Sequence, residues 1–348
     1  MPSFRTHRVE EILQERPGLQ RVRLDDASRA YVLTQLTGDV ATGDEVVVNT
    51  TAVELGLGTG GWHVVHWNLS RRSLDLPGPG HIMKVRYTSL QADTGAAEEH
   101  LPSDAEALGL PRLGGVPVLV GSLHSQLGTC VAVLRSLQPA WRISYVMTDG
   151  AALPLALSDL VADLTDRGWI TGTVTAGHAF GGALEAVSVP SALQLAVEEQ
   201  HADVVVVAMG PGVVGTARAL GTTAVEVAAV SAAAERLGAR PVVVARASEA
   251  DARPRHRGLS HHTRTSLALT PCAVEVALPP ELADHAPSLA PHHVHVVEPG
   301  DVADLLDRAG LRVTTMGRGP ERDPLSFRTV AAAAVHAASV RPPDQGTV

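Results

Sequence analysis

The stretch Ala202–Thr216, ADVVVVAMGPGVVGT, decides the fold that we expect for this chain. Four consecutive valines run into a turn that contains Gly210, Pro211, Gly212 and Gly215. An unbroken apolar run of this kind is typical of a strand buried on both faces of a parallel sheet. The stretch therefore predicts a buried strand that ends in a glycine loop, and we expect that loop to form one wall of the functional site.

From Val116 onward, similar apolar runs alternate with segments of helical periodicity. This alternation predicts an α/β fold with a doubly wound, mostly parallel Rossmann-like sheet over residues 116–340. The expected strands are Val116–Val120, Arg142–Thr148, Ile170–Thr175, Asp203–Met209, Pro241–Ala245, Ala273–Leu278, His293–Val297 and Leu311–Met316. The expected helices are Gln126–Leu137, Leu155–Arg167, Ser191–Gln200, Val225–Leu237, Thr263–Leu269, Val302–Ala309 and Arg328–Ala338.

Residues 1–90 have a different character, with short strands separated by turn residues. We expect a small all-β barrel of five or six strands, of the OB or SH3-like kind, because closure removes exposed strand edges. Residues 91–115 are polar, acidic and rich in glycine and proline, as a linker would be, and residues 341–348 are expected to be a disordered tail. The expected barrel strands are Arg8–Leu13, Leu19–Leu24, Arg29–Leu33, Glu45–Asn49, Trp62–Asn68 and Lys84–Leu90.

The composition excludes several kinds of partner. The formal net charge of −9 argues against a protein that grips nucleic acid. No apolar run reaches the ~20 residues of a membrane helix, and the N-terminus lacks an apolar signal region, so we expect a cytoplasmic protein with no membrane partner. The alanine-rich segment Ala331–Ala338 and an exposed glycine loop at Leu55–Gly61 offer flat apolar surface, which favours a homo-oligomer, most simply a dimer.

Small, polar and imidazole residues follow five successive strands of the expected sheet. Ligands bind outside the carboxyl ends of strands in open parallel sheets, so we expect these segments to form one site. The segments are Gly121–Gln126, Thr148–Gly150, Gly177–Gly182, Gly210–Thr216 and the loop from Arg246 to His262.

Residues 253–264, RPRHRGLSHHTR, hold four arginines and three histidines in an otherwise acidic chain. A guanidinium matches a carboxylate or phosphate with two parallel hydrogen bonds, and the start of a helix near His262 would direct N–H groups to the same place. We therefore predict a small anionic ligand, the alternative being a solvated basic loop or a subunit surface. The predicted ligand-binding residues are Gly210, Gly212, Gly215, Thr216, Arg253, Arg255, Arg257, Ser260 and His262.

Four residues are predicted to carry chemistry. His178 or His261 would act as general acid and base, Asp149 would orient an imidazole or accept a proton, and His124 is a further candidate. No metal is assigned, but a metal-dependent hydrolase that uses His124, His178 and His261 is one alternative. A non-catalytic ligand-binding or regulatory protein is another, and the cofactor stays unspecified.

The segment Gly210–Gly215 matches GxGxxG after a strand, yet other features of a dinucleotide site are missing. Such a site needs a helix at once and an acidic residue about 20 positions later. Pro211 has no N–H to offer a phosphate, and the next strand ends in Arg246. A more general phosphate or carboxylate loop is therefore favoured. No serine lies in a GxSxG turn, which argues against a hydrolase triad.

Several motifs occur in the order of a known bacterial family. They are Thr37-Gly38-Asp39, Asn49–Ala52, Leu55–Gly61, Tyr145–Pro154, Gly177–Gly182, Met209–Thr216 and Arg255–Thr263. Over nearly its whole length the chain resembles the family catalogued as domain of unknown function 3866. The resemblance supports the domain layout and one shared site, and it implies no reaction, substrate or cofactor. Ala183 and Ala217 depart from the acidic residue and the glycine expected there.

Overall fold

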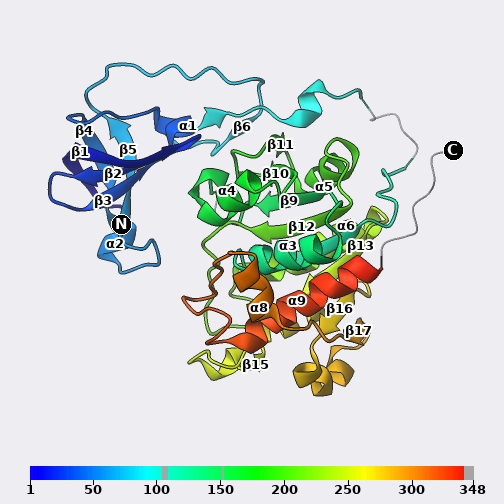
Figure 1. The fold of residues 1–348 in the computed structure, drawn as a ribbon. Helices are drawn as coiled ribbons and strands as arrows, with labels where there is room; N and C mark the ends of the chain where they lie inside the picture. The colour runs from blue at the N-terminus through cyan, green and yellow to red at the C-terminus, as the bar shows by residue number, and fades with distance from the viewer. Residues whose placement is uncertain (104–108, 151–152, 341–348) are drawn as a thin grey trace.

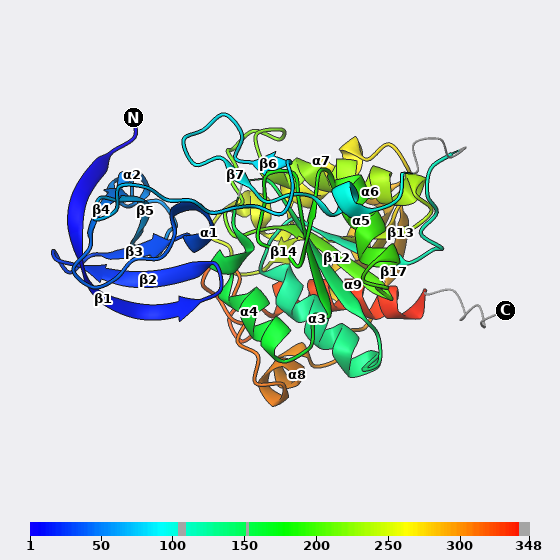
Figure 2. The same cartoon turned by 90° about the horizontal axis from the view of Figure 1, so that it is seen from above.

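The computed structural model describes residues 1–103, 109–150 and 153–340. Within these residues the chain forms an N-terminal barrel and a larger α/β part that lie side by side (Figure 1, Figure 2). The α/β fold and the N-terminal barrel were both expected, and both are confirmed. The expected tail at 341–348 lies outside the described residues.

The larger part is built on one parallel sheet of eight strands within the described residues. The strand order is β11-β10-β9-β12-β8-β13-β16-β17, so β12, which carries the valine run, lies near the centre with β9 and β8 beside it. This position explains why the strand has no polar alternation, because both of its faces are covered. The strands are β8 Pro117–Gly121, β9 Ile143–Thr148, β10 Gly172–Ala176, β11 Leu184–Ala186, β12 Val204–Met209, β13 Arg240–Val244, β16 Glu275–Leu278 and β17 His293–Val296.

Helices cover both faces of this sheet (Figure 1). Buried side chains of α3, α4, α8 and α9 share one hydrophobic cluster, and those of α5, α6 and α7 share the cluster on the opposite face. This arrangement confirms the doubly wound plan. The helices are α3 Gln126–Leu137, α4 Asp159–Asp166, α5 Val189–Glu198, α6 Glu226–Arg236, α7 His261–Leu269, α8 Val302–Arg308 and α9 Pro324–Ser339.

The barrel closes in the order β1-β2-β3-β5-β4 around a small core rich in valine. Short helices α1 Thr34–Thr37 and α2 Thr51–Glu54 lie in its connections. Arg16 and Arg21 reach from the barrel to Asp159 at the start of α4, with N–O distances of 2.7 and 2.8 Å. The strands are β1 Phe4–Arg16, β2 Leu19–Leu24, β3 Arg29–Val32, β4 Glu45–Asn49 and β5 Trp62–Asn68.

Two expected strands are wrong. The segment 84–90 is not a sixth barrel strand: only Met83–Lys84 (β6) is extended, and it pairs with Ala92–Asp93 (β7) outside the barrel. The segment 311–316 forms no strand, because its buried residues Leu311 and Val313 join the hydrophobic cluster beneath α3 instead of extending the sheet. The eighth strand is β11, whose three residues are too few to show a pattern in the sequence.

Smaller differences concern helix starts. The helix expected from Leu155 begins at Asp159, after a 3₁₀ turn (η2, Leu155–Leu157), because the Ser158 side chain caps it by accepting the N–H of Val161. In the part of the chain that the structure describes, no helix is long and apolar enough to cross a membrane. The domain limits and the dimer stay predictions.

Candidate functional site

The loop that follows β12 forms a closed turn at the carboxyl edge of the sheet. The N–H of Thr216 donates to Gly221 O at 2.7 Å, and the hydroxyl of Thr222 donates to Val214 O at 3.0 Å. Helix α6 begins only at Glu226, after the 3₁₀ turn η3 (Thr223–Val225). The loop is therefore not followed at once by a helix, which agrees with the sequence argument against a dinucleotide fingerprint.

Gly215 brings this loop against the arginine- and histidine-rich loop. A Cβ atom at position 215 would lie 3.1 Å from Cε1 and 3.3 Å from Nε2 of His262. These distances are tighter than ordinary side-chain contacts. The absence of a side chain at Gly215 therefore allows the two loops to touch.

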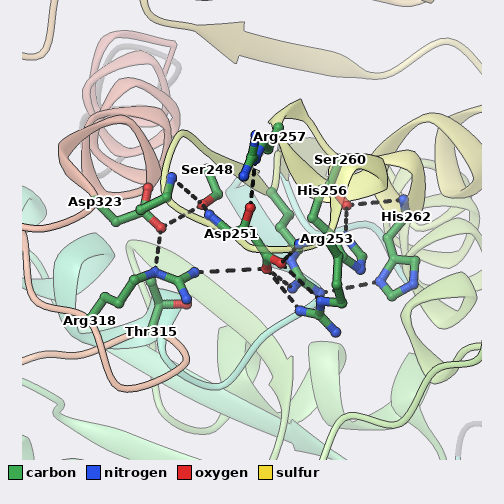
Figure 3. Close-up of polar contacts among 12 residues, drawn as sticks. Ser248, Asp251, Arg253, His256, Arg257, Ser260, His262, Thr315, Arg318 and Asp323 are labelled. Atoms are coloured by element: carbon green, nitrogen blue, oxygen red, sulfur yellow. Dashed lines mark hydrogen bonds and ion pairs between the residues drawn. The ribbon is translucent and has the colours of Figure 1, made fainter.

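The second loop runs from the end of β13 to the start of α7 and is organised by Asp251 (Figure 3). The side chain of Arg253 donates to both oxygens of Asp251, at 2.9 and 2.8 Å, and its backbone N–H donates as well. Arg246 and Arg318 lie 3.6 and 3.8 Å from the same carboxylate, which is buried. The bonds from Arg253 hold the pKa of Asp251 well below its usual range.

A second buried carboxylate joins this loop to the start of α9. Ser248 Oγ donates to Asp323 Oδ2 at 2.6 Å, and Arg318 Nε donates to the same oxygen at 3.0 Å. Asp323 is fully buried, and Figure 3 shows it facing Ser248 and Arg318. Elements that are far apart in the sequence therefore hold the loop in one conformation.

Guanidinium groups outnumber carboxylates around a small pocket between the two loops. Asp251 and Asp323 are shared by Arg246, Arg253 and Arg318, while Arg255 has no carboxylate partner among the described residues. Arg246 is 7% exposed, and burial lowers its pKa to about 10, so it stays charged at neutral pH. The pocket has a volume of about 70 Å³ and is lined by Val213, Val214, Gly215, Thr216, Arg246, Arg253, Arg255, His256, His262 and Met316.

Three imidazoles form one wall of this region. The ring centroids of His256, His261 and His262 lie 4.3 to 4.9 Å apart. Burial, assisted by Arg246, lowers the pKa of His256 to about 3, and burial also lowers the pKa of His262 to about 4. The pKa of His261 is lowered by burial and by Arg255. The cluster is therefore uncharged at neutral pH.

Ser260 holds two of these histidines in place. Its Oγ lies 2.8 Å from His256 Nδ1 and accepts the N–H of His262 at 3.2 Å, which caps α7. The Nε2 atoms of His261 and His262 are buried and have no hydrogen-bond partner among the described residues. Buried polar atoms nearly always find a partner, so these two neighbouring nitrogens are free to accept one.

The structure brings together most of the predicted ligand-binding residues. Gly215, Thr216, Arg253, Arg255 and His262 line the pocket. Ser260 hydrogen-bonds to His256, and the ring of His261 packs against the rings of His256 and His262.

Three other predicted ligand-binding residues lie away from the pocket. Gly210 is buried beside Met147 and Leu153, and Gly212 is exposed outside the pocket lining. Arg257 donates through Nε to the carbonyl oxygen of Asp251, and Figure 3 shows its side chain directed away from His262. Fewer of the predicted residues therefore line this pocket than the sequence suggested.

His178 and Asp149 form a separate group at the ends of β9 and β10. Asp149 Oδ2 accepts the backbone N–H of His178 at 3.2 Å, so it orients the chain and not the ring. His178 Nδ1 accepts the N–H of Val85 at 3.0 Å, and its Nε2 lies 3.4 Å from Arg86. Within the described residues, no hydrogen bond or ion pair joins His178 or Asp149 to the arginine cluster of Arg246, Arg253 and Arg318.

His124 has both ring nitrogens engaged inside the fold. Its Nε2 lies 2.7 Å from Ser158 Oγ, and its Nδ1 lies 3.3 Å from the hydroxyl of Tyr145. Burial lowers the pKa of His124 to about 4. These contacts join α3, β9 and α4 and leave no nitrogen for a ligand.

His124, His178 and His261, the set expected to bind a metal if the protein were a metal-dependent hydrolase, do not form one group in the described residues. Across the described ranges, groups of three side chains with converging ligand atoms occur in three places. They are His256-His261-His262, Glu275-His295-His336 and His7-Asp25-Asp26. Only His261 of the expected set belongs to one of them, and its partners are its neighbours in the chain.

Several polar groups at this edge of the sheet were not predicted from the sequence. Asp251 precedes Arg253 by two positions, a spacing typical of a side chain that accepts a nearby N–H in a turn, and this signal could have identified it. Nothing local marks Arg318 or Asp323. Glu226 is also new: Thr148 Oγ1 lies 2.9 and 3.0 Å from its carboxylate oxygens, and burial raises the pKa of Glu226 to about 7.

Comparisons with known proteins identify a family and no activity. The model of one protein family, described as "Protein of unknown function (DUF3866)", matches residues 29–334. A search of curated proteins and a search of solved structures each found no match.

Proposed function

Because the chain belongs to the family described as "Protein of unknown function (DUF3866)", which brings no activity with it, we propose the function from the pocket. The protein is an enzyme that acts on a small anionic metabolite, and phosphorylated compounds are the first class to test. The anionic group binds between the loop 210–216 and the loop 246–262, where Arg246, Arg253 and Arg255 surround the pocket.

The observation that carries this proposal is the surplus of guanidinium groups around a buried arginine. A buried cation is retained when it is paired. Among the residues that the structure describes, Arg246 has one carboxylate partner, Asp251, which lies 3.6 Å away and already accepts two hydrogen bonds from the Arg253 side chain. An incoming phosphate or carboxylate would supply the missing negative charge. Arginine is suited to this task because its planar fork matches such groups with two hydrogen bonds.

The size of the pocket limits what enters it. Its volume of about 70 Å³ corresponds to roughly two to three water molecules in the liquid. Such a space accepts an anionic head group and leaves the remainder of the metabolite outside. Arg255 is exposed at the pocket and is placed to meet the anion first.

Isothermal titration with inorganic phosphate tests the binding step. We expect Arg255→Ala to weaken phosphate binding at least tenfold, because the variant removes a guanidinium that no carboxylate balances. Arg257→Ala is the matched control: it lies in the same turn, is also exposed, and contacts Asp251 outside the pocket. Equal losses in both variants, or wild-type protein that binds no phosphate, would contradict the proposal.

A panel of phosphorylated and carboxylated metabolites separates an enzyme from a sensor. Compounds that raise the melting temperature are incubated with the protein and followed by ³¹P and ¹H NMR. We expect conversion of at least one of them, and we expect His261→Gln to abolish turnover while the affinity for the compound changes by less than about fivefold. Binding without conversion of any compound would favour a non-catalytic regulatory protein.

A further inference from the structure

We infer that His256, His261 and His262 form a cage for one divalent transition metal ion at the edge of the anion pocket. Three imidazoles with an open fourth position are a ligand set that suits Zn²⁺. The metal site can be tested apart from the anion proposal, because imidazoles would bind the metal whereas guanidinium groups would bind the anion, although His256 and His262 also line the anion pocket.

The three rings already converge. One ring nitrogen from each histidine lies within 4.8 Å of the corresponding nitrogens of the other two. Zinc binds imidazole nitrogen at about 2.0–2.1 Å, so ligand nitrogens in a tetrahedral site lie roughly 3.4 Å apart. Side-chain rotations that move each nitrogen by about 1 Å therefore close the cage.

The unpaired nitrogens of His261 and His262 are the ligand atoms that these two rings offer to a metal. The Nε2 atoms of His261 and His262 are both buried, and their surfaces are closed to water. A metal ion would give both nitrogens a partner at once.

Ser260 supports the cage from outside. The hydroxyl lies 2.8 Å from His256 Nδ1, which leaves Nε2 of that ring free to bind a metal. Metal-binding histidines commonly hydrogen-bond through their other nitrogen, and this bond fixes the orientation of the ring. His256 is itself 1% exposed, so its orientation is set by the surrounding protein.

Arg246 weakens metal binding at His262 when no anion is present, without preventing it. Its Nη1 lies 3.4 Å from His262 Nδ1, and a guanidinium can only donate hydrogen bonds. His262 can bind a metal through Nε2 only when Nδ1 carries the proton, which places two N–H groups against each other. An anion in the pocket would draw Arg246 toward itself and relieve this conflict. Coupling between anion and metal rests on the proposed function, whereas the cage does not.

Zinc binding to the full chain tests the cage. Protein stripped with a chelator is titrated with Zn²⁺ in the absence of phosphate, and the bound metal is counted by mass spectrometry. We expect one Zn²⁺ per chain, at least 100-fold weaker binding in His261→Gln, and X-ray absorption that shows nitrogen ligands at about 2.0–2.1 Å. His261 is partly exposed, so the variant is expected to fold, and circular dichroism checks this.

His295→Gln is the matched control, because it belongs to the other histidine-rich group, Glu275-His295-His336. Its zinc affinity should stay within threefold of wild type. Wild-type protein without stoichiometric zinc would overturn the inference. Loss of zinc in His295→Gln with retention in His261→Gln would overturn it as well, because the ion would then lie at the other group.

Arg246→Gln separates the two proposals. A glutamine oxygen can accept the Nδ1–H of His262, so we expect this variant to bind zinc at least threefold more tightly than wild type. Phosphate should tighten zinc binding in wild type and leave the variant unchanged. Zinc binding without phosphate binding would end the anion proposal and keep the cage, and phosphate binding without zinc would do the reverse.

Discussion

Among the residues that the structure describes, Lys84 and Arg246 are buried cations at the carboxyl edge of the sheet, and they differ in how completely they are paired. Lys84, the only lysine in the sequence, donates to Thr175 O at 2.9 Å, to Ala179 O at 2.6 Å and to Glu185 Oε2 at 2.6 Å. An ammonium group has three donors, so its capacity is filled. Around Arg246, by contrast, donors exceed acceptors and two imidazole nitrogens have no partner among the described residues.

The difference separates a structural ion pair from the proposed binding site. Glu185 also accepts the N–H of Gly181 at 2.6 Å and the hydroxyl of Thr175 at 2.6 Å, so the lysine site is closed to any further ligand. Burial lowers the pKa of Lys84, and Glu185 acts against this shift. The hydrogen bonds of Lys84 attach its segment to β10 and to Glu185 of β11. Around Arg246, in contrast, donor groups without an acceptor remain for the proposed ligand.

The largest expected effect comes from breaking the filled network. Lys84→Met leaves Glu185 and two carbonyl groups buried without their partner. Breaking a buried pair from one side costs about 3–5 kcal/mol, and we expect a loss of that size in the free energy of unfolding. Urea denaturation measures it. Arg86→Met is the control, because Arg86 is exposed and contacts only His178 at 3.4 Å. A loss below about 1 kcal/mol in Lys84→Met would show that the network is not structural.

In the arginine cluster we expect a smaller loss of stability, together with a larger stabilisation by phosphate. Asp251→Asn removes the charge that Arg246, Arg253 and Arg318 share. We expect about 2–3 kcal/mol of stability to disappear, because the amide oxygen still accepts hydrogen bonds while the charge is gone. An anion can replace that charge, so phosphate should raise the melting temperature of the variant more than that of wild type. Scanning calorimetry measures the melting temperatures of both proteins with and without phosphate. An equal rise in the two proteins would show that phosphate does not replace the charge of Asp251.

The sequence predicted the arginine cluster better than the hydrogen-bond network of Lys84, because the residues of the cluster are mostly close together in the chain. The residues from Arg253 to His262 are close in the chain and follow a strand, so their position at the sheet edge could be inferred from topology. Lys84 is 91 residues away from Thr175, and nothing near it indicates where its side chain ends. The segment around Lys84 was therefore assigned to the barrel.

Two other residues show where local pattern fails. Val313 alternates with polar neighbours as a strand residue would, yet its segment forms no strand and its side chain packs against α3. His124 follows a strand as predicted, but its two ring nitrogens are hydrogen-bonded to the hydroxyl groups of Tyr145 and Ser158. Both outcomes depend on partners that no local window of sequence contains.

Glu226 differs from both sites, because it is a partly buried carboxyl group whose only side-chain hydrogen-bond partner in the described part of the chain is the hydroxyl of Thr148. Burial raises its pKa from 4.5 to about 7. Below about pH 4.5 the group is protonated in both the folded and the unfolded state. Between pH 4.5 and 7 the unfolded chain releases this proton first, so the stability of the fold decreases as the pH rises, and the loss is complete above pH 7.

The measurement is urea unfolding at pH 5 and pH 8 for wild type and Glu226→Gln. The variant does not titrate at this position, so it should become more stable relative to wild type by about 2 kcal/mol between the two pH values. Glu235→Gln lies on the same helix and is exposed, and it should follow wild type at both pH values. An unchanged difference between wild type and Glu226→Gln would mean that Glu226 is ionised in the fold throughout this range.

The smallest expected effect tests whether the glycine loop belongs to the unfilled cluster at all. Gly215→Ala adds a methyl group 3.1 Å from Cε1 of His262 and 3.2 Å from the hydroxyl of Thr222. The imidazole must move by a few tenths of an ångström, which should cost less than about 1 kcal/mol of stability. The same movement disturbs both the pocket wall and the histidine cage, so affinity for phosphate and for zinc should fall three- to tenfold. Gly58→Ala, in a loop with no atom near the added methyl group, should leave both affinities unchanged. If Gly215→Ala weakened neither ligand, the loop after β12 would be a neighbour of the site and not one of its walls.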